Sequence, residues 1–236
     1  MKTARHSLLA VAVMSAVLLA CAPTLARAVT ILGTNDDFTI NWFLAQGGFD
    51  NDGTPAPFAL SATAVFDVQS LTSTALLLNV TVTNNTNTQN QSSITTLGIG
   101  VTPDATMASL LGPGDVFDTV VVQGGQQNFP GGFKKIDLCI FADGCNGGSI
   151  NDGLLSGQTD TFTLLINGPF GATPAVTLSP FPIKFQTAGG GLEFAGTDAS
   201  PVPEPSTLML LGSGLTGLVL ATRLRRPTRI KTEQIN

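Results

Sequence analysis

The most informative absences in this sequence concern the side chains of acid–base and phosphoryl chemistry. The chain has no tyrosine and a single histidine, His6, and residues 29–200 contain no arginine. Ser-His-Asp or Cys-His catalysis therefore cannot be assembled from residues 29–200. A phosphoryl-transfer site is not expected there either, because no arginine or histidine is available to neutralise the phosphoryl group and no Gly-x-x-x-x-Gly-Lys loop occurs.

Positive charge of any kind is scarce between the two ends of the chain. Residues 29–200 carry 14 acidic side chains against Lys134, Lys135 and Lys184, which gives a net charge of −11. A segment this acidic repels nucleic acid and anionic lipid headgroups. We therefore expect no nucleic-acid partner, and the suitable partners are cations, cationic polymers or neutral polysaccharide.

The N-terminus has the three parts of a secretory signal peptide. Lys2 and Arg5 form a basic start, residues 8–20 are uncharged and largely apolar, and Ala26-Arg27-Ala28 is a small-x-small cleavage site. We expect residues 1–28 to be removed and the following segment to be extracytoplasmic. An alternative is a lipoprotein signal, in which Cys21 of Leu-Leu-Ala-Cys would be acylated.

The C-terminus combines a rigid acidic motif, an apolar run and a basic cluster. Pro203, Glu204 and Pro205 precede an uncharged run that spans 16 residues, 207–222, or about 24 Å of helix. That length is short against a hydrocarbon core of about 30 Å, but the basic residues that follow would hold one end in the cytoplasm. These are Arg223, Arg225 and Arg226, with a further basic tail at 227–236. A single transmembrane helix is predicted.

This order of residues strongly resembles the PEP-CTERM sorting signal of Gram-negative bacteria, whose motif has also been labelled an ice-binding C-terminal domain. The resemblance covers residues 203–226. It implies an exported protein that is held transiently in the inner membrane and cut near Pro-Glu-Pro by an exosortase. It also implies an exopolysaccharide-producing bacterium and a final location in the envelope or outside the cell.

The segment between the two ends has the pattern of an antiparallel β-sandwich or jelly roll. Apolar side chains recur at every second position, most clearly at Leu76, Leu78, Val80 and Val82, and clusters of Gly, Asn, Asp or Pro separate the runs. We predict one all-β domain at 29–196 and a linker at 197–202. The expected strands are 60–68, 74–83, 94–101, 116–122, 133–141, 161–166, 176–178, 183–186 and 192–195.

Cys139 and Cys145 are the only pair of residues in this body that suggests covalent chemistry. In an exported protein, two cysteines separated by a turn predict a disulfide, worth about 2.4 kcal/mol for a loop of about seven residues. Zinc binding is one alternative, although the body has no histidine and no second cysteine pair to complete a tetrahedral site. A redox site is another, although it would favour Cys-x-x-Cys. With the Gly-rich loop and the Asp-Thr-Phe-Thr-Leu strand, these cysteines are also loosely similar to the cistern group of PEP-CTERM proteins.

Carboxylates and aromatic side chains supply the remaining candidate sites. Asp50 and Asp52, in Asp-Asn-Asp-Gly, are candidate calcium ligands, and Asn35-Asp36-Asp37 is a second acidic loop. Most other aspartates stand where turns favour them. Trp42, with Phe43 and Phe49, is either a sugar-stacking platform or part of the core.

We expect an exported cell-surface or matrix protein that associates with exopolysaccharide and has no catalysis or cofactor of its own, calcium excepted. A carbohydrate- or ice-binding module is the alternative, although the threonines look too scattered for the ladder that ice binding would need. A secreted glycosidase is a second alternative, which would require two converging buried aspartates.

Overall fold

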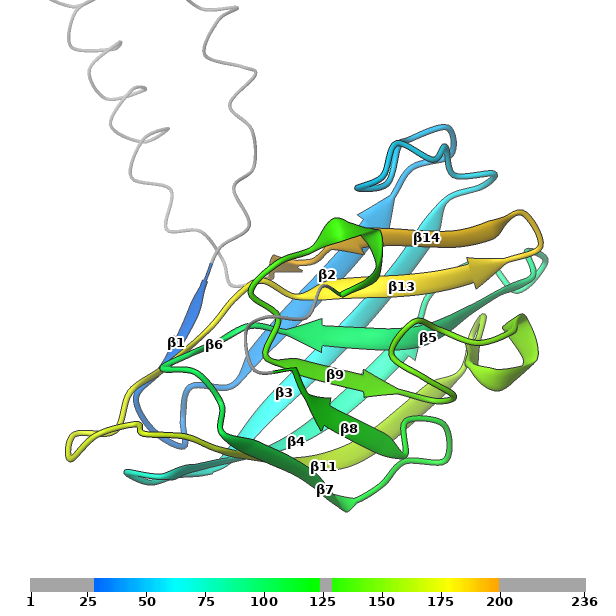
Figure 1. Ribbon diagram of the computed structural model, residues 1–236. Coiled ribbons are helices and arrows are strands. Elements are labelled where there is room, and N and C mark those ends of the chain that lie inside the picture. Colours follow the sequence, from blue (N-terminus) through cyan, green and yellow to red (C-terminus); the bar gives the residue numbers. More distant parts are fainter. Residues whose placement is uncertain (1–27, 124–128, 200–236) are drawn as a thin grey trace, which may run out of the picture. The chain divides into compact units, whose positions relative to one another are not determined.

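The computed structural model describes residues 28–123 and 129–199, and all of the regular sheet structure there is antiparallel (Figure 1). The all-β prediction is therefore confirmed. The predicted signal peptide, sorting motif, membrane helix and basic tail lie outside the described residues. Within those residues, no helix is long and apolar enough to cross a membrane.

Two six-stranded sheets and one three-stranded sheet make up the described body. Sheet 1 has the strand order β15 (Thr197–Asp198), β2 (Phe38–Leu44), β3 (Leu60–Leu71), β4 (Ala75–Asn84), β11 (Thr159–Asn167) and β7 (Met107–Gly112). Sheet 2 has the order β14 (Gly190–Ala195), β13 (Pro182–Thr187), β5 (Ser92–Ile99), β9 (Leu138–Phe141) and β8 (Thr119–Val122), with β10 (Leu154–Leu155) also paired to β5. The small sheet joins β1 (Val29–Ile31), β12 (Val176–Leu178) and β6 (Val101–Thr102).

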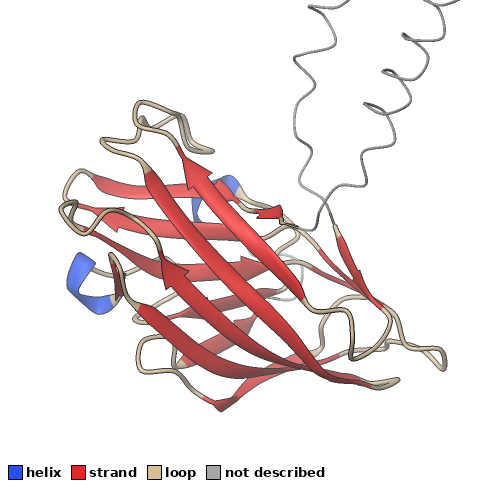
Figure 2. Cartoon of the chain, turned by 180° about the vertical axis from the view of Figure 1, so that it is seen from behind, coloured by secondary structure: helices blue, strands red, loops and turns tan. Residues whose placement is uncertain are grey.

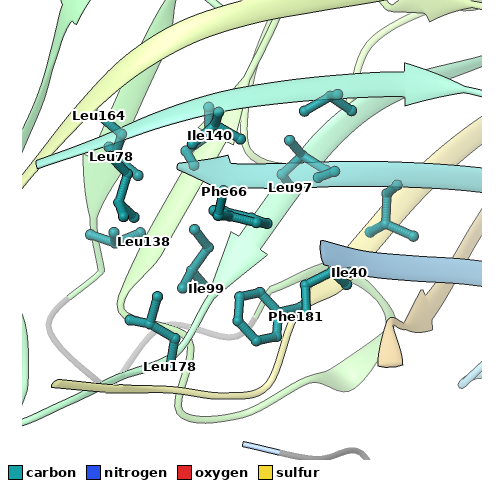
Figure 3. Packing of buried hydrophobic residues seen from close by; sticks show 14 of the residues in the cluster. Ile40, Phe66, Leu78, Leu97, Ile99, Leu138, Ile140, Leu164, Leu178 and Phe181 are labelled. Atoms are coloured by element: carbon teal, nitrogen blue, oxygen red, sulfur yellow. The ribbon is translucent and has the colours of Figure 1, made fainter. Parts of the chain in front are cut away.

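The core lies between sheets 1 and 2 and is filled by the alternate apolar side chains of both (Figure 3). Phe38 and Phe66 stack with ring centroids 4.5 Å apart, and Phe181 packs against both rings. One void of about 10 Å³ lies among these side chains, which is at most the room of one water molecule. The body is thus a packed β-sandwich, and this void is too small for an organic ligand.

The two sheets differ in what covers their outer faces. Sheet 2 carries a second apolar cluster on its outside, formed by Phe129, Ile136 and Cys139. Sheet 1 instead alternates buried and solvent-facing side chains along β2, β3, β4 and β11, and no other described segment covers its outer face (Figure 2).

Two predicted strands are shorter in the structure than expected, each for a physical reason. The segment 116–122 contributes only β8 at 119–122, because the N–H groups of Val116 and Phe117 donate to the Asp160 carboxylate at 3.1 and 2.8 Å. The segment 133–141 contributes only β9 at 138–141, and Lys135 has a φ of 60°, which interrupts an extended chain.

The body also extends further than its predicted end. Thr197 and Asp198, expected in the linker, form β15 and pair with Asn41 and Ile40 of β2. The ordered sheet therefore reaches two residues into the segment 197–202.

Candidate functional site

The predicted disulfide between Cys139 and Cys145 is present. The two Cα atoms are 5.8 Å apart, and Cys139 is completely buried on β9. Cys145 belongs to the turn that follows, and its sulfur accepts a hydrogen bond from the Gln123 amide at 2.7 Å. Because Cys139 packs against Phe129 and Ile136, the disulfide helps to hold the loops that cover the outside of sheet 2. The burial and packing of Cys139 are typical of a disulfide that stabilises a fold.

The candidate calcium loop uses its first carboxylate to hold its own backbone. Asp50 is 8% exposed, and it accepts hydrogen bonds from the N–H groups of Asp52 and Thr54 at 3.0 and 2.7 Å. Its second oxygen accepts from the N–H of Glu193 at 3.3 Å. Among the described residues, no group of three or more His, Cys, Asp or Glu side chains is arranged to hold a metal ion. The geometry of Asp50 is that of an Asx turn that also anchors the loop to β14.

Other acidic side chains are occupied in a similar way. Asp160 accepts three N–H groups from residues 115–117, and Glu193 pairs with Lys184 at 2.6 Å. Asp137 is 3% exposed; one oxygen accepts the N–H of Val101 at 2.7 Å, and the other has no hydrogen-bond partner within residues 28–123 and 129–199. Burial raises the pKa of this carboxyl group, and the hydrogen bond from Val101 opposes the rise.

Of the two alternatives for Trp42, the structure supports the core position, because this side chain is 2% exposed and its indole N–H donates to the Phe181 carbonyl at 2.8 Å. Its neighbour Phe43 points outward and is 68% exposed, as is Phe49 in the following loop. The core interpretation therefore holds for Trp42 alone.

Sheet 1 gathers threonines on its solvent face, contrary to the expectation that they are scattered. Strand register places Thr63, Thr83 and Thr159 in one row and Thr81 and Thr161 in the next. The hydroxyl oxygens of the pairs Thr81–Thr161 and Thr83–Thr159 are each 3.0 Å apart. We call the outward side of β2, β3, β4, β11 and β15 the threonine-rich face. Its threonines are Thr39, Thr63, Thr81, Thr83, Thr159, Thr161, Thr163 and Thr197.

A groove of about 450 Å³ opens beside the β4–β5 loop. We call it the hydroxyl–amide groove, and its lining side chains are Thr88, Asn90, Gln91, Ser92, Ile150, Asn151, Leu155 and Ser156. None of these residues is ionisable. The volume falls within the range of about 300–1,000 Å³ typical of small-molecule sites.

Three segments position this groove. The hydroxyls of Ser92 and Ser156 lie 2.9 Å apart, and Ser156 also donates to the Asn90 carbonyl at 2.9 Å. The third segment is the short helix η3 (Ile150–Asp152), where the Asp152 carboxylate accepts the N–H and hydroxyl of Ser149. These hydrogen bonds lower the pKa of Asp152. The polar stretch near 90 was visible in the sequence, but its partners at 150–156 were not.

The comparison with known families decides the role of the C-terminus. A family model described as the PEP-CTERM protein-sorting motif matches residues 201–226. The chain carries a PEP-CTERM sorting signal. No curated protein matches the chain. The PEP-CTERM motif implies an exported protein with a membrane-anchored sorting signal that is targeted to and processed by an exosortase.

Proposed function

We propose that this PEP-CTERM protein is a non-catalytic component of the cell surface or extracellular matrix that associates with exopolysaccharide. The observation that carries the proposal is the sorting motif at 201–226. The body supports it: buried carboxylates such as Asp50 and Asp160 are engaged by backbone N–H groups, and the groove lining contains no carboxylate. A net charge of −11 disfavours anionic partners and leaves neutral polysaccharide as a suitable one.

A combined Pro203→Ala, Glu204→Ala, Pro205→Ala variant tests this function in a host that carries an exosortase. We expect the variant to remain full length in the membrane fraction, because the processing enzyme loses its recognition element, while the wild-type protein leaves it. Thr232→Ala, Glu233→Ala, Gln234→Ala is the matched control, since it alters three residues outside the motif. Unchanged release of the first variant on immunoblots counts against exosortase processing.

Ice binding is a second candidate function, favoured by the threonine-rich face. Adjacent strands lie about 4.8 Å apart and alternate residues of one strand about 6.7 Å apart, so paired rows such as Thr81–Thr161 and Thr83–Thr159 form a small regular array of hydroxyls. Thr161→Lys should abolish inhibition of ice recrystallisation, whereas Thr173→Lys, an exposed threonine elsewhere, should not. Equal activity of both variants would remove this candidate.

A further inference from the structure

Most of the hydroxyl–amide groove is lined by uncharged segments of a highly charged body, although Asp152 of η3 follows the lining residue Asn151. Residues 68–103 contain no ionisable side chain, and neither do residues 153–159. These two segments supply most of the groove lining. In a body of net charge −11, they provide surface that can be covered by a partner without desolvating a charge, which is a large cost for an unpaired ion.

The polar side chains of the groove share one chemical property. Hydroxyl and carboxamide groups both donate and accept hydrogen bonds, whereas a carboxylate only accepts and an ammonium or guanidinium only donates. Gln91 and Asn151 are exposed at the rim, and Ser92 and Ser156 lie within. A ligand that satisfies such a lining needs groups that also both donate and accept, and it needs no charge.

The two apolar side chains of the lining add a second requirement. Ile150 and Leu155 contribute aliphatic surface, and Leu155 is 38% exposed. A sugar ring offers hydroxyls at its edge and C–H groups on its face, so it matches both kinds of surface. An anionic polymer does not match, because no cationic side chain lines the groove and the body repels negative charge.

The groove is also held in shape before any ligand arrives. Gly157 donates its N–H to the Asn84 carbonyl at 2.7 Å, and its φ of 81° suits the turn that leads Ser156 out of the groove. Ser92 and Ser156 fix the floor, and Asp152 fixes the wall that carries Asn151. Such preorganisation reduces the entropic cost of binding.

From this geometry we propose that the hydroxyl–amide groove binds a segment of a neutral polysaccharide. The inference rests on the proposed function and names the place where the polymer is held. A shallow groove without an aromatic side chain in its lining should bind weakly, with a Kd on the order of 1 mM per site. Many protein copies on one polymer chain would raise the overall affinity.

Two double variants, one in the groove and one control outside it, test the proposal in the full-length chain purified in detergent. Gln91→Glu with Asn151→Asp makes two rim amides acceptor-only and anionic without changing their size. Asn87→Asp with Gln89→Glu is the matched control, because both amides are exposed in the same β4–β5 loop as Gln91 and do not line the groove. Equal melting temperatures establish that both variants are folded.

Affinity electrophoresis in gels that contain dextran, hydroxyethylcellulose or galactomannan provides the readout, with alginate as the anionic polymer. We expect at least one neutral polymer to retard the wild-type chain and its control variant, and the groove variant to bind about tenfold more weakly. Leu155→Ala, which adds no charge, should also weaken binding.

Two results overturn the proposal: no retardation by any of the neutral polymers, whether or not alginate retards the chain, or equal loss in the groove and control variants. Fractionation of the same variants separates this failure from failure of the proposed function. Processing depends on residues 201–226, so the groove variant should leave the membrane as the wild-type chain does.

Discussion

The hydroxyl oxygens of Thr81 on β4 and Thr161 on β11 lie 3.0 Å apart on the solvent face of sheet 1. The two residues are 80 positions apart in the chain. Cross-strand threonine pairs of this kind contribute about 0.2–1 kcal/mol, so the pair is both a stabilising contact and part of the threonine-rich face.

A double-mutant cycle on this pair should detect the contact. Thr81→Ala and Thr161→Ala together are expected to cost less than the sum of the single changes, with a coupling of about 0.2–1 kcal/mol in urea unfolding. Thr81→Ala combined with Thr173→Ala should be additive, because Thr173 lies in the loop before β12. Additive costs in both cycles would mean that the Thr81–Thr161 contact contributes nothing.

The Cys139–Cys145 disulfide should stabilise the body modestly. Cys139→Ser is expected to lower the free energy of unfolding by about 2 kcal/mol, since the bond closes a short loop in the unfolded chain. Wild-type protein that is denatured without reductant should show no reactive thiol from Cys139 or Cys145. Labelling of both residues would contradict the bond and revive a metal or redox role.

Asp137 and Asp152 should give the stability of the body opposite dependences on pH. The raised pKa of Asp137 means that its contribution is most favourable below about pH 3.8 and is lost as the pH rises through the folded-state value. The lowered pKa of Asp152 makes its contribution present above about pH 3.8 and lost as the pH falls.

Asp137→Asn should therefore become more stable relative to the wild type between pH 4 and pH 7, as measured by urea midpoints. The change keeps an acceptor for the Val101 N–H while removing a buried charge. Asp152→Asn serves as the control of opposite sign, since it should lose stability relative to the wild type as the pH rises from 3 to 5. Parallel pH profiles for all three proteins would contradict both assignments.

Calcium and magnesium should raise the melting temperature equally and slightly. The Asp50 carboxylate is already occupied by three backbone N–H groups, so added cations should only screen the repulsion within a body of net charge −11. Differential scanning calorimetry at matched ionic strength checks this. A shift with calcium alone, abolished by Asp50→Asn with Asp52→Asn, would instead establish a calcium site.

Several strands with one buried face were predicted from the sequence, although β2 and β7 were not among the expected strands. Along β4 and β11 every second residue is apolar except Asn84 and Asp160, because one side of each strand faces the core and the other faces water. Trp42 and Phe43 show where this reasoning ends. Adjacent residues of a strand point to opposite faces, and composition alone did not indicate which of the two aromatic rings enters the core.

The candidate surfaces could not be predicted because they depend on pairing between distant segments. Thr81 and Thr83 alternate with Val80 and Val82 in the sequence, which places them on the polar side of a strand. Their partners at 159 and 161 follow only from the register of β4 with β11. The groove likewise needs Ser156 beside Ser92, a contact across 64 positions. The sorting signal was predictable for the opposite reason, since all of its residues are consecutive.

Mass spectrometry of the mature protein's C-terminus tests the central claim most directly. If an exosortase processes this chain at its PEP-CTERM motif, the protein recovered outside the inner membrane should end near Pro203-Glu204-Pro205 and contain no peptide from residues 227–236. Recovery of an intact C-terminus that ends at Asn236, in protein outside the membrane, would contradict the account.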